Sequence, residues 1–251
     1  MIGNRTERIL EAVIREFVAS GHPVSSDELY EDYSFGIKPA SIRAELLRLT
    51  HAGFLEQPHT SGGRVPTESG YALWVDELLR DIFGADEAAP SMGKLFGEAL
   101  DGRLERVVEP LVEELRLLGV GYDARDREVY KSGLDELCER IDFKTREDFL
   151  EVVRDFDRLD ASLARLAANV SEGKPRVFIG KSPITRSSHL SVVVARYNVA
   201  GAPIFLAAIG PKRMDYKRAL NVFKELPGGK KTRKQENKKA INQESKKARK
   251  Q

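Results

Sequence analysis

Residues 38–75 constrain the fold more than any other stretch, because two helical patterns enclose a short, turn-rich segment there. Pro39 suits the first turn of a helix, since its missing N–H would have no partner at that position. The apolar residues that follow recur at helical spacing, and they are Ile42, Leu46 and Leu49. A second apolar stripe, which predicts core packing, consists of Tyr71, Trp74, Val75, Leu78 and Leu79.

Between these helices the sequence predicts a two-stranded hairpin. Residues 54–58 and 64–67 read as short strands, and the tip between them contains Gly62 and Gly63. The prolines within the two strands prevent extension of the ribbon, because proline cannot donate to a strand ladder. A helix followed by such a hairpin is typical of a winged helix-turn-helix reader of DNA.

Two further helices are expected before the recognition helix. The first begins with a capping-box pattern at Asn4 and ends at Gly21. The second is short and opens with a capping box of Ser25 and Glu28. Residues 1–80 therefore have the order of elements that a winged reading module needs.

The expected nucleic-acid contacts come from the recognition helix and the wing. Ser41 permits close approach, and Arg43 can hydrogen-bond guanine or grip phosphate, while Lys38 adds positive charge. The helix face opposite the apolar stripe is expected to carry Ser41, Ala44, Glu45 and Arg48, with Arg43 at its flank. The wing offers phosphate-binding groups, and these residues are His59, Thr60, Ser61 and Arg64. A solvated helix face and a plain hairpin turn are the alternative interpretations.

Charge is distributed unevenly along the 251 residues, whose formal net charge is +2. Residues 227–251 carry ten basic and two acidic side chains, a net charge of +8, so residues 1–226 carry −6. This tail is low in apolar residues and is expected to be disordered in isolation. It either adds nonspecific attraction to phosphate or acts only as a solubilising tail.

Several function classes find no support in the sequence. No apolar run approaches the roughly 20 residues of a membrane helix, and the N-terminus does not read as a signal peptide, so a cytoplasmic protein without a membrane partner is expected. Cys138 is the single cysteine and reads as a buried structural thiol, and the four histidines show no metal-ligand spacing. No catalytic spacing is visible, so we expect no enzyme activity, no metal and no cofactor.

The second half reads as a connection followed by a mixed domain. A linker is expected at 84–93. Leucine and valine then alternate four and three residues apart, as in a coiled-coil seam, at Leu104, Val108, Leu111, Leu115 and Leu118. This helix, interrupted by Pro110, is the candidate dimer contact, and packing on its own domain is the alternative. Residues 119–121 are expected to end it.

Regular elements are expected again beyond residue 130. A long amphipathic helix is predicted over residues 149–166. Three strands follow at 177–179, 190–197 and 204–209, and a closing helix at 217–226.

Four motifs resemble the family of the heat-inducible transcription repressor HrcA. They are GHPVSS at 21–26, PASIR at 39–43, LEQPHTSGGRVPTESGY at 55–71 and the Gly-Pro-x-Arg-Met signature at 210–214. The resemblance implies a winged-helix domain that binds, as a homodimer, an inverted-repeat operator upstream of chaperone genes and represses them. It also implies that the chaperonin GroE keeps the repressor active, and that the second domain is GAF-like.

By position, the recognition-helix motif of that family falls on Pro39, Ser41, Ile42 and Arg43, and the wing motif on His59, Thr60, Ser61, Gly63 and Arg64. Asp27 stands where the family is often basic, and Lys181-Ser182 where it usually has Glu and Asn. The segment before Tyr130 is shorter than in typical members. The first strands of the GAF-like sheet and most of an inserted dimerisation subdomain are therefore expected to be missing.

These patterns together predict an α+β protein. Its parts are a winged-helix domain at 1–80, a linker and helical segment at 81–129, a truncated GAF-like domain at 130–226 and a disordered basic tail at 227–251. The predicted function is sequence-specific repression of heat-shock genes by a dimer on double-stranded DNA. A protein-interaction adaptor, suggested by the net charge of −4 over residues 1–80, and an RNA-binding protein are the alternatives.

Overall fold

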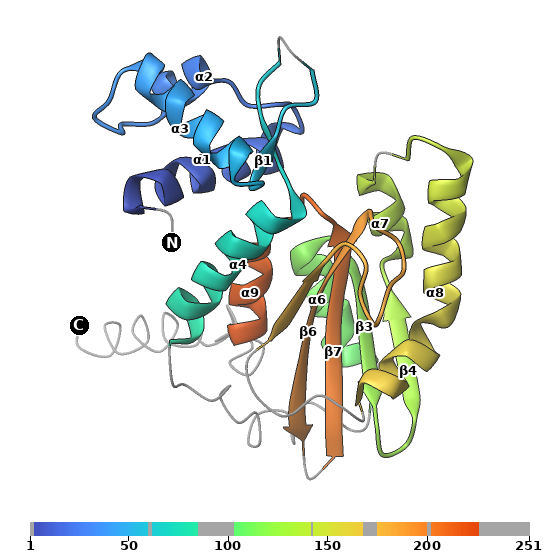
Figure 1. Cartoon of the computed structure of the whole chain (residues 1–251). Helices are drawn as coiled ribbons and strands as arrows, with labels where there is room; N and C mark the ends of the chain where they lie inside the picture. Colours follow the sequence, from blue (N-terminus) through green and yellow to red (C-terminus); the bar gives the residue numbers. More distant parts are fainter. Residues whose placement is uncertain are drawn as a thin grey trace, which may run out of the picture.

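The computed structural model describes residues 3–59, 62–84, 103–141, 143–167, 175–199 and 202–225. A group of helices with a small hairpin stands above a five-stranded sheet that has helices on both faces (Figure 1). The predicted α+β class is confirmed. The expected linker beyond Gly84 and the basic tail lie outside the described residues. No helix within the described ranges is long and apolar enough to cross a membrane.

Three helices and a hairpin form the N-terminal unit. The predicted capping box is confirmed, since Glu28 N donates to Ser25 Oγ at 3.2 Å and Ser25 N donates to Glu28 Oε2 at 2.7 Å. The first helix starts one residue earlier than predicted, because Gly3 holds the N-cap position without a side-chain hydrogen bond. The elements are α1 (Asn4–Ser20), α2 (Ser26–Asp32), α3 (Pro39–His51), β1 (Leu55–Glu56) and β2 (Val65–Pro66).

The hairpin is extended by a third short strand segment from the loop between α1 and α2. Val24 N donates to Arg64 O at 2.9 Å, and Arg64 N donates to Val24 O at 2.7 Å. This close pairing requires glycine at position 63, because a Cβ there would lie 2.4 Å from the Val24 carbonyl oxygen. The pairing therefore fixes the base of the hairpin to the entry of α2.

The second unit is built on an antiparallel sheet with the strand order β4-β3-β7-β6-β5. Residues of β6 alternate between the two faces, so Val193 and Ala195 belong to one apolar cluster, and Val192 and Val194 to the other. The strands are β3 (Leu118–Asp123), β4 (Glu128–Ser132), β5 (Arg176–Ile179), β6 (Leu190–Val199) and β7 (Ala202–Pro211). The flanking helices are α6 (Glu105–Leu115) and α9 (Tyr216–Glu225) on one face, and α7 (Leu134–Arg140) and α8 (Arg146–Ala167) on the other.

The described sheet has two strands more than the three that the sequence predicts. Residues 119–121, expected to end a helix, lie instead in the centre of β3. The glycines are there because α6 crosses this strand closely: a Cβ at Gly119 would lie 2.7 Å from Val112 Cγ2, and one at Gly121 would lie 2.9 Å from Val108 Cγ2. The two glycines therefore indicate close packing of a helix on a strand, and not the end of a helix.

The apolar stripe of α6 is buried within its own chain. Val108 and Leu111 are 0% and 1% exposed and belong to the cluster between α6 and the sheet. Leu118 is not part of the helix, since it belongs to β3 and faces the opposite cluster. The stripe is thus not available as a coiled-coil seam. The helix packs on its own domain, which is the alternative that the sequence left open.

Helix α4 (Glu68–Phe83) joins the two units. It follows β2 directly and runs beside α9 (Figure 1). One continuous apolar cluster includes Ile9 of α1, Ile42 of α3, Trp74 of α4 and Leu220 of α9. The core therefore does not end at the boundary between the N-terminal unit and the sheet.

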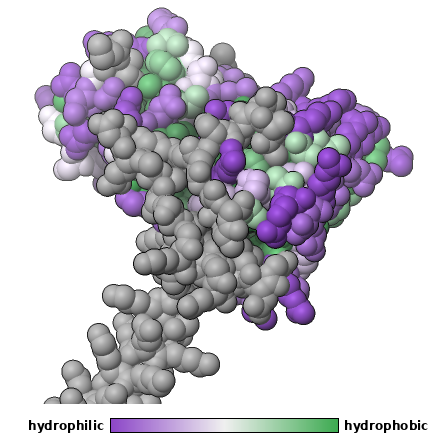
Figure 2. Space-filling model, turned by 90° about the horizontal axis from the view of Figure 1, so that it is seen from below, coloured by the Kyte–Doolittle hydropathy of each residue, from purple (hydrophilic) through white to green (hydrophobic). Residues whose placement is uncertain are grey.

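Charged and polar residues make up much of the described surface that is visible from below (Figure 2). A smaller group of hydrophobic residues is exposed among them in this view. Across all described residues, the large apolar side chains that are exposed are Tyr30, Leu47 and Phe149.

Candidate nucleic-acid interface

Helix α3 turns an apolar face inward and leaves its basic residues in solvent. Ile42 and Leu49 are fully buried, whereas Lys38, Ser41 and Arg43 are exposed. Ser41 and Arg43 are two positions apart, which separates them by about 160° around the axis of a helix with 3.6 residues per turn. The two predicted contact residues therefore lie on different flanks of α3.

Glu45 does not lie on the outward face, contrary to the sequence-based expectation. It is 4% exposed and accepts hydrogen bonds from Thr6 Oγ1 at 2.9 Å and from a guanidinium nitrogen of Arg48 at 3.1 Å. Arg5 adds an ion pair at 3.6 Å. Burial of a carboxylate requires such partners, and the periodicity of apolar residues alone could not show them. As a result, the exposed surface of α3 carries no acidic side chain.

Arg43 shares a cleft of about 360 Å³ with residues of the β1–β2 hairpin and of α2. The hairpin contributes Gln57, Gly62, Gly63 and Arg64 to its lining, and α2 with its cap contributes Ser25, Ser26 and Asp27. The structure therefore brings Arg43 and Arg64 to one recess. Arg48 and Ser41 lie on the other flank of α3.

Arg64 braces the hairpin against α3. Its Nε donates to Thr50 Oγ1 at 3.0 Å, and a terminal guanidinium nitrogen lies 3.5 Å from the carbonyl oxygens of Gly62 and Gly63. The side chain is half-buried. Of the other predicted wing residues, His59 is exposed three residues beyond the end of β1, and Thr60 and Ser61 lie outside the described residues.

Sequence reasoning missed the centre of the outward face of α3. That position is held by Leu47, whose exposed fraction is 47%. Ala40, Ala44 and His51 are exposed on the same side. A helical wheel drawn from the buried stripe would have found them, because they lie roughly opposite to it at 3.6 residues per turn.

Acidic side chains gather between α1 and α4. Burial raises the pKa of Glu77, and the nearby charges of Glu7, Asp81 and Glu11 raise it further. Helix α2 carries four more acidic side chains and no basic one, so the negative charge of the N-terminal unit lies mainly on α2 and α4, while α3 presents cations. This placement gives an acidic unit a locally basic face.

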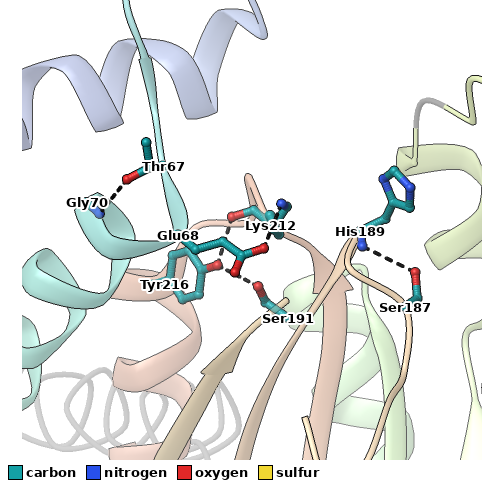
Figure 3. Close-up of polar contacts among 8 residues, drawn as sticks. All are labelled: Thr67, Glu68, Gly70, Ser187, His189, Ser191, Lys212 and Tyr216. Carbon is teal, nitrogen blue, oxygen red and sulfur yellow. Dashed lines mark hydrogen bonds and ion pairs between the residues drawn. The ribbon is translucent and has the colours of Figure 1, made fainter. Parts of the chain in front are cut away.

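Lys212 of the Gly-Pro-x-Arg-Met motif lies where the sheet unit meets α4 (Figure 3). Lys212 Nζ lies 3.1 Å from Glu68 Oε1, in the first turn of α4. Gly180 is also close, because a Cβ there would lie 2.6 Å from the same carboxylate oxygen. The Arg213 guanidinium reaches Gly21, the left-handed C-cap of α1, where an added Cβ would lie 3.4 Å from it. The motif therefore contacts both helices.

Tyr216, two residues beyond the motif, is fully buried against α4. Its ring lies 5.6 Å from that of Tyr71 and 6.3 Å, edge-on, from that of Trp74. Its hydroxyl is 2.7 Å from both Ser191 Oγ and the Lys212 carbonyl oxygen (Figure 3). The carbonyl oxygen can only accept, so the Tyr216 hydroxyl donates its hydrogen bond to the Lys212 carbonyl. The Ser191 hydroxyl then donates to the Tyr216 oxygen. Burial raises the pKa of Tyr216, which keeps this proton in place.

The loop that departs from the family pattern is nevertheless ordered by local hydrogen bonds. Ser182 Oγ accepts from Ile184 N at 3.1 Å and from Thr185 N at 2.9 Å. Asp155 of α8, 3% exposed, accepts from Ser187 N at 2.8 Å. Serine at position 182 therefore supports a turn by its hydroxyl.

Cys138 on α7 is partly buried. Burial and the charge of Asp135 raise the pKa of its thiol, so the thiol form is favoured. Among the residues with described positions, no group of three or more His, Cys, Asp or Glu is arranged to hold a metal ion.

The fold and this interface define a class of protein: a helical unit with a basic face, joined by a shared helix to an antiparallel sheet domain. The family profile described as HrcA protein C terminal domain matches residues 86–220, just over half of the chain, and the chain belongs to the HrcA family.

Two curated relatives carry the name heat-inducible transcription repressor HrcA. The protein of Desulforudis audaxviator is 43% identical over 86 residues, which are 34% of this chain and 25% of that protein. The protein of Clostridium perfringens is 36% identical over 119 residues, which are 47% of this chain and 34% of that protein. The matched regions thus span about a quarter to a third of the relatives' length.

A solved structure shows the same fold over nearly the whole chain. This crystal structure, of a protein described as hypothetical, has a TM-score of 0.69 and 18% sequence identity, and the match covers 91% of this chain and 97% of that chain.

Proposed function

We propose that this chain is a heat-inducible transcription repressor that acts in the cytoplasm. In this proposal it binds, as a dimer, an inverted-repeat sequence in double-stranded DNA upstream of chaperone genes. Membership of the HrcA family and the name of the curated relatives, heat-inducible transcription repressor, support it. The observation that carries it is the exposed surface of α3 and its N-cap, which presents Lys38, Arg43 and Arg48 while the only carboxylate of the helix, Glu45, is buried.

The N-terminal elements act in this proposal as a winged helix-turn-helix. Helix α3 follows α2 after a short turn and has the exposed basic surface of a recognition helix. A major groove about 12 Å wide admits such a helix. The β1–β2 hairpin, held against α3 by the bond of Arg64 to Thr50, follows as the wing beside the phosphate backbone.

Two copies are needed because an inverted repeat presents two half-sites. In known helix-turn-helix dimers the half-sites are about 34 Å apart, or a multiple of this spacing. The second unit serves as a reduced GAF-like domain, with GroE as the partner that keeps the repressor active, and the basic tail adds nonspecific attraction to phosphate. The repressor bound to the inverted repeat then blocks polymerase.

Binding to DNA of defined sequence tests this proposal directly. The full chain is titrated against an inverted repeat from its own chaperone promoter and against scrambled DNA, over a range of salt concentrations. Preference for the inverted repeat supports a sequence-specific repressor. Equal and salt-sensitive binding to both duplexes contradicts sequence-specific reading, and no binding favours the competing proposal of a protein-interaction adaptor, which the net charge of −4 over residues 1–80 suggests.

Arg43→Ala is expected to weaken binding to the inverted repeat by about 1–3 kcal/mol and to relax base preference, because an arginine fork discriminates guanine by paired hydrogen bonds. Competition titrations with single-base operator variants measure both effects. Arg80→Ala, which removes an exposed arginine from α4, is the matched control and should leave base preference unchanged. Equal losses on operator and random DNA would show that Arg43 reads no base.

Arg64→Ala should behave differently, because Arg64 holds the hairpin to α3 and faces the backbone in this proposal. We expect similar weakening on every DNA sequence. A change of base preference in this variant would assign Arg64 a reading role.

A further inference from the structure

Leu47 is exposed although every other large apolar residue of α3 is buried. Its exposed fraction is 47%, whereas those of Ile42, Leu46 and Leu49 are 0%, 4% and 0%. The inward stripe is complete without it. An apolar side chain at position 47 therefore does not contribute to the core of the N-terminal unit.

The neighbours of Leu47 make it the main projection of the outward face. Ala44 lies three positions before it and ends at a methyl group, as does Ala40 one further turn away. Exposed cations flank this surface, with Arg43 on one side and Arg48 on the other. One leucine between alanines is too small for a protein-binding patch, which usually covers several hundred Å².

A small apolar contact with a cationic rim matches the chemistry of the major groove. Phosphates border the groove, and the thymine methyl is its apolar group, which is read by side chains such as alanine. Helix α3 itself has no exposed carboxylate that would repel the backbone, since Glu45 is buried, and Asp27 of α2 lines the cleft on the Arg43 side. Charge complementarity thus selects DNA as the occupant.

We propose that Leu47 reads a thymine methyl group in each half-site of the operator. This assignment rests on the proposed function and deepens it, because it names the base feature that the centre of α3 recognises. Leu47 then acts as a specificity-determining residue. The arginines on its flanks bind guanine edges or phosphates.

The test replaces each thymine of the inverted repeat, one at a time, by uracil, which lacks only the methyl group. At one position per half-site, the wild-type chain should lose about fourfold in affinity, the equivalent of one buried methyl. Leu47→Ala should bind the thymine and uracil duplexes equally at that position. Phe149→Leu, which changes an exposed apolar residue of α8, is the matched control and should keep the wild-type discrimination.

Two results overturn the assignment in different ways. If the wild-type chain prefers the inverted repeat but no uracil substitution matters, or if Leu47→Ala retains the penalty, the role of Leu47 is wrong and the repressor proposal stands. If no preference for the inverted repeat exists, the proposed function fails, and the assignment fails with it. Because Leu47 is exposed, the thermal midpoint of Leu47→Ala should match that of the wild type, which shows that the variant is folded.

Discussion

Two buried tyrosine hydroxyls at the junction of α4 and α9 have opposite hydrogen-bonding situations. The Tyr216 hydroxyl lies 2.7 Å from both Ser191 Oγ and the Lys212 carbonyl oxygen. The Tyr71 hydroxyl, also buried, has no hydrogen-bond partner in the part of the chain that the structure describes. The rings contact each other at 5.6 Å, so hydroxyl deletion leaves the same aromatic contact in both cases.

Tyr216→Phe is expected to lower the free energy of unfolding by about 1–3 kcal/mol, because it leaves the buried Ser191 hydroxyl and the partly buried Lys212 carbonyl without their partner. Tyr71→Phe serves as the matched control and should be neutral or stabilising by up to about 1 kcal/mol, since it removes an unpaired polar atom. Urea titrations of both variants measure the difference. Equal effects would contradict the hydrogen-bond assignment at Tyr216.

For single residues, the sequence pattern predicts interactions between near neighbours in the chain better than it predicts contacts between distant residues. The Ser25–Glu28 capping box could be predicted because both partners lie within four residues. The burial of Glu45 could not, because its partner Thr6 lies 39 positions away. The hydrogen bond from Arg64 to Thr50 could not be predicted either, because the two residues lie 14 positions apart. From the sequence alone, Arg64 therefore reads as a free phosphate ligand.

The crossing of α6 over β3 shows how a short glycine pattern specifies an element. Gly119 and Gly121 are alternate residues of the strand and so face the same side. On that side lie Val108 and Val112 of α6, near enough that any Cβ would collide with them. The helix therefore lies directly on the backbone of the strand.

Gly119→Ala should destabilise the chain by about 1–3 kcal/mol through overpacking. Val112→Ala opens the space that the new methyl group needs, so the double variant should lose about 1 kcal/mol less than the sum of the two single losses. Thermal and urea unfolding of the three variants form a double-mutant cycle. Strict additivity would show that Val112 does not limit the approach of α6.

Helices were more predictable than strands in this chain. Helix α3 follows from Pro39 and the apolar stripe behind it, which are local signals. Strand β3 is buried along its whole length and contains two glycines, so it shows neither polar alternation nor high strand propensity. The role of α6 depends on the sheet beneath it, and an apolar stripe alone does not distinguish a sheet from a second helix.

For the whole molecule, the continuous apolar cluster from α1 to α9 predicts cooperative unfolding of both units. Trp74, the only tryptophan, lies at their junction and reports on it. Its fluorescence and the far-ultraviolet circular dichroism should therefore give coincident midpoints in urea. Repeating the measurement at two protein concentrations distinguishes unfolding from subunit dissociation, because only dissociation depends on the protein concentration. Loss of the tryptophan signal at lower urea would show that the N-terminal unit separates first.

The direct passage from β2 into α4 also affects how a dimer would meet DNA. Pro66 ends the hairpin, Thr67 caps α4, and the helix from Glu68 is packed against α9 of the sheet unit. Thr67 is the one residue between the hairpin and α4, so in the proposed dimer two copies would present their α3 helices at a fixed separation. The dimer would therefore measure the spacer between half-sites, and operators with added or deleted base pairs would be rejected even when both half-sites are intact.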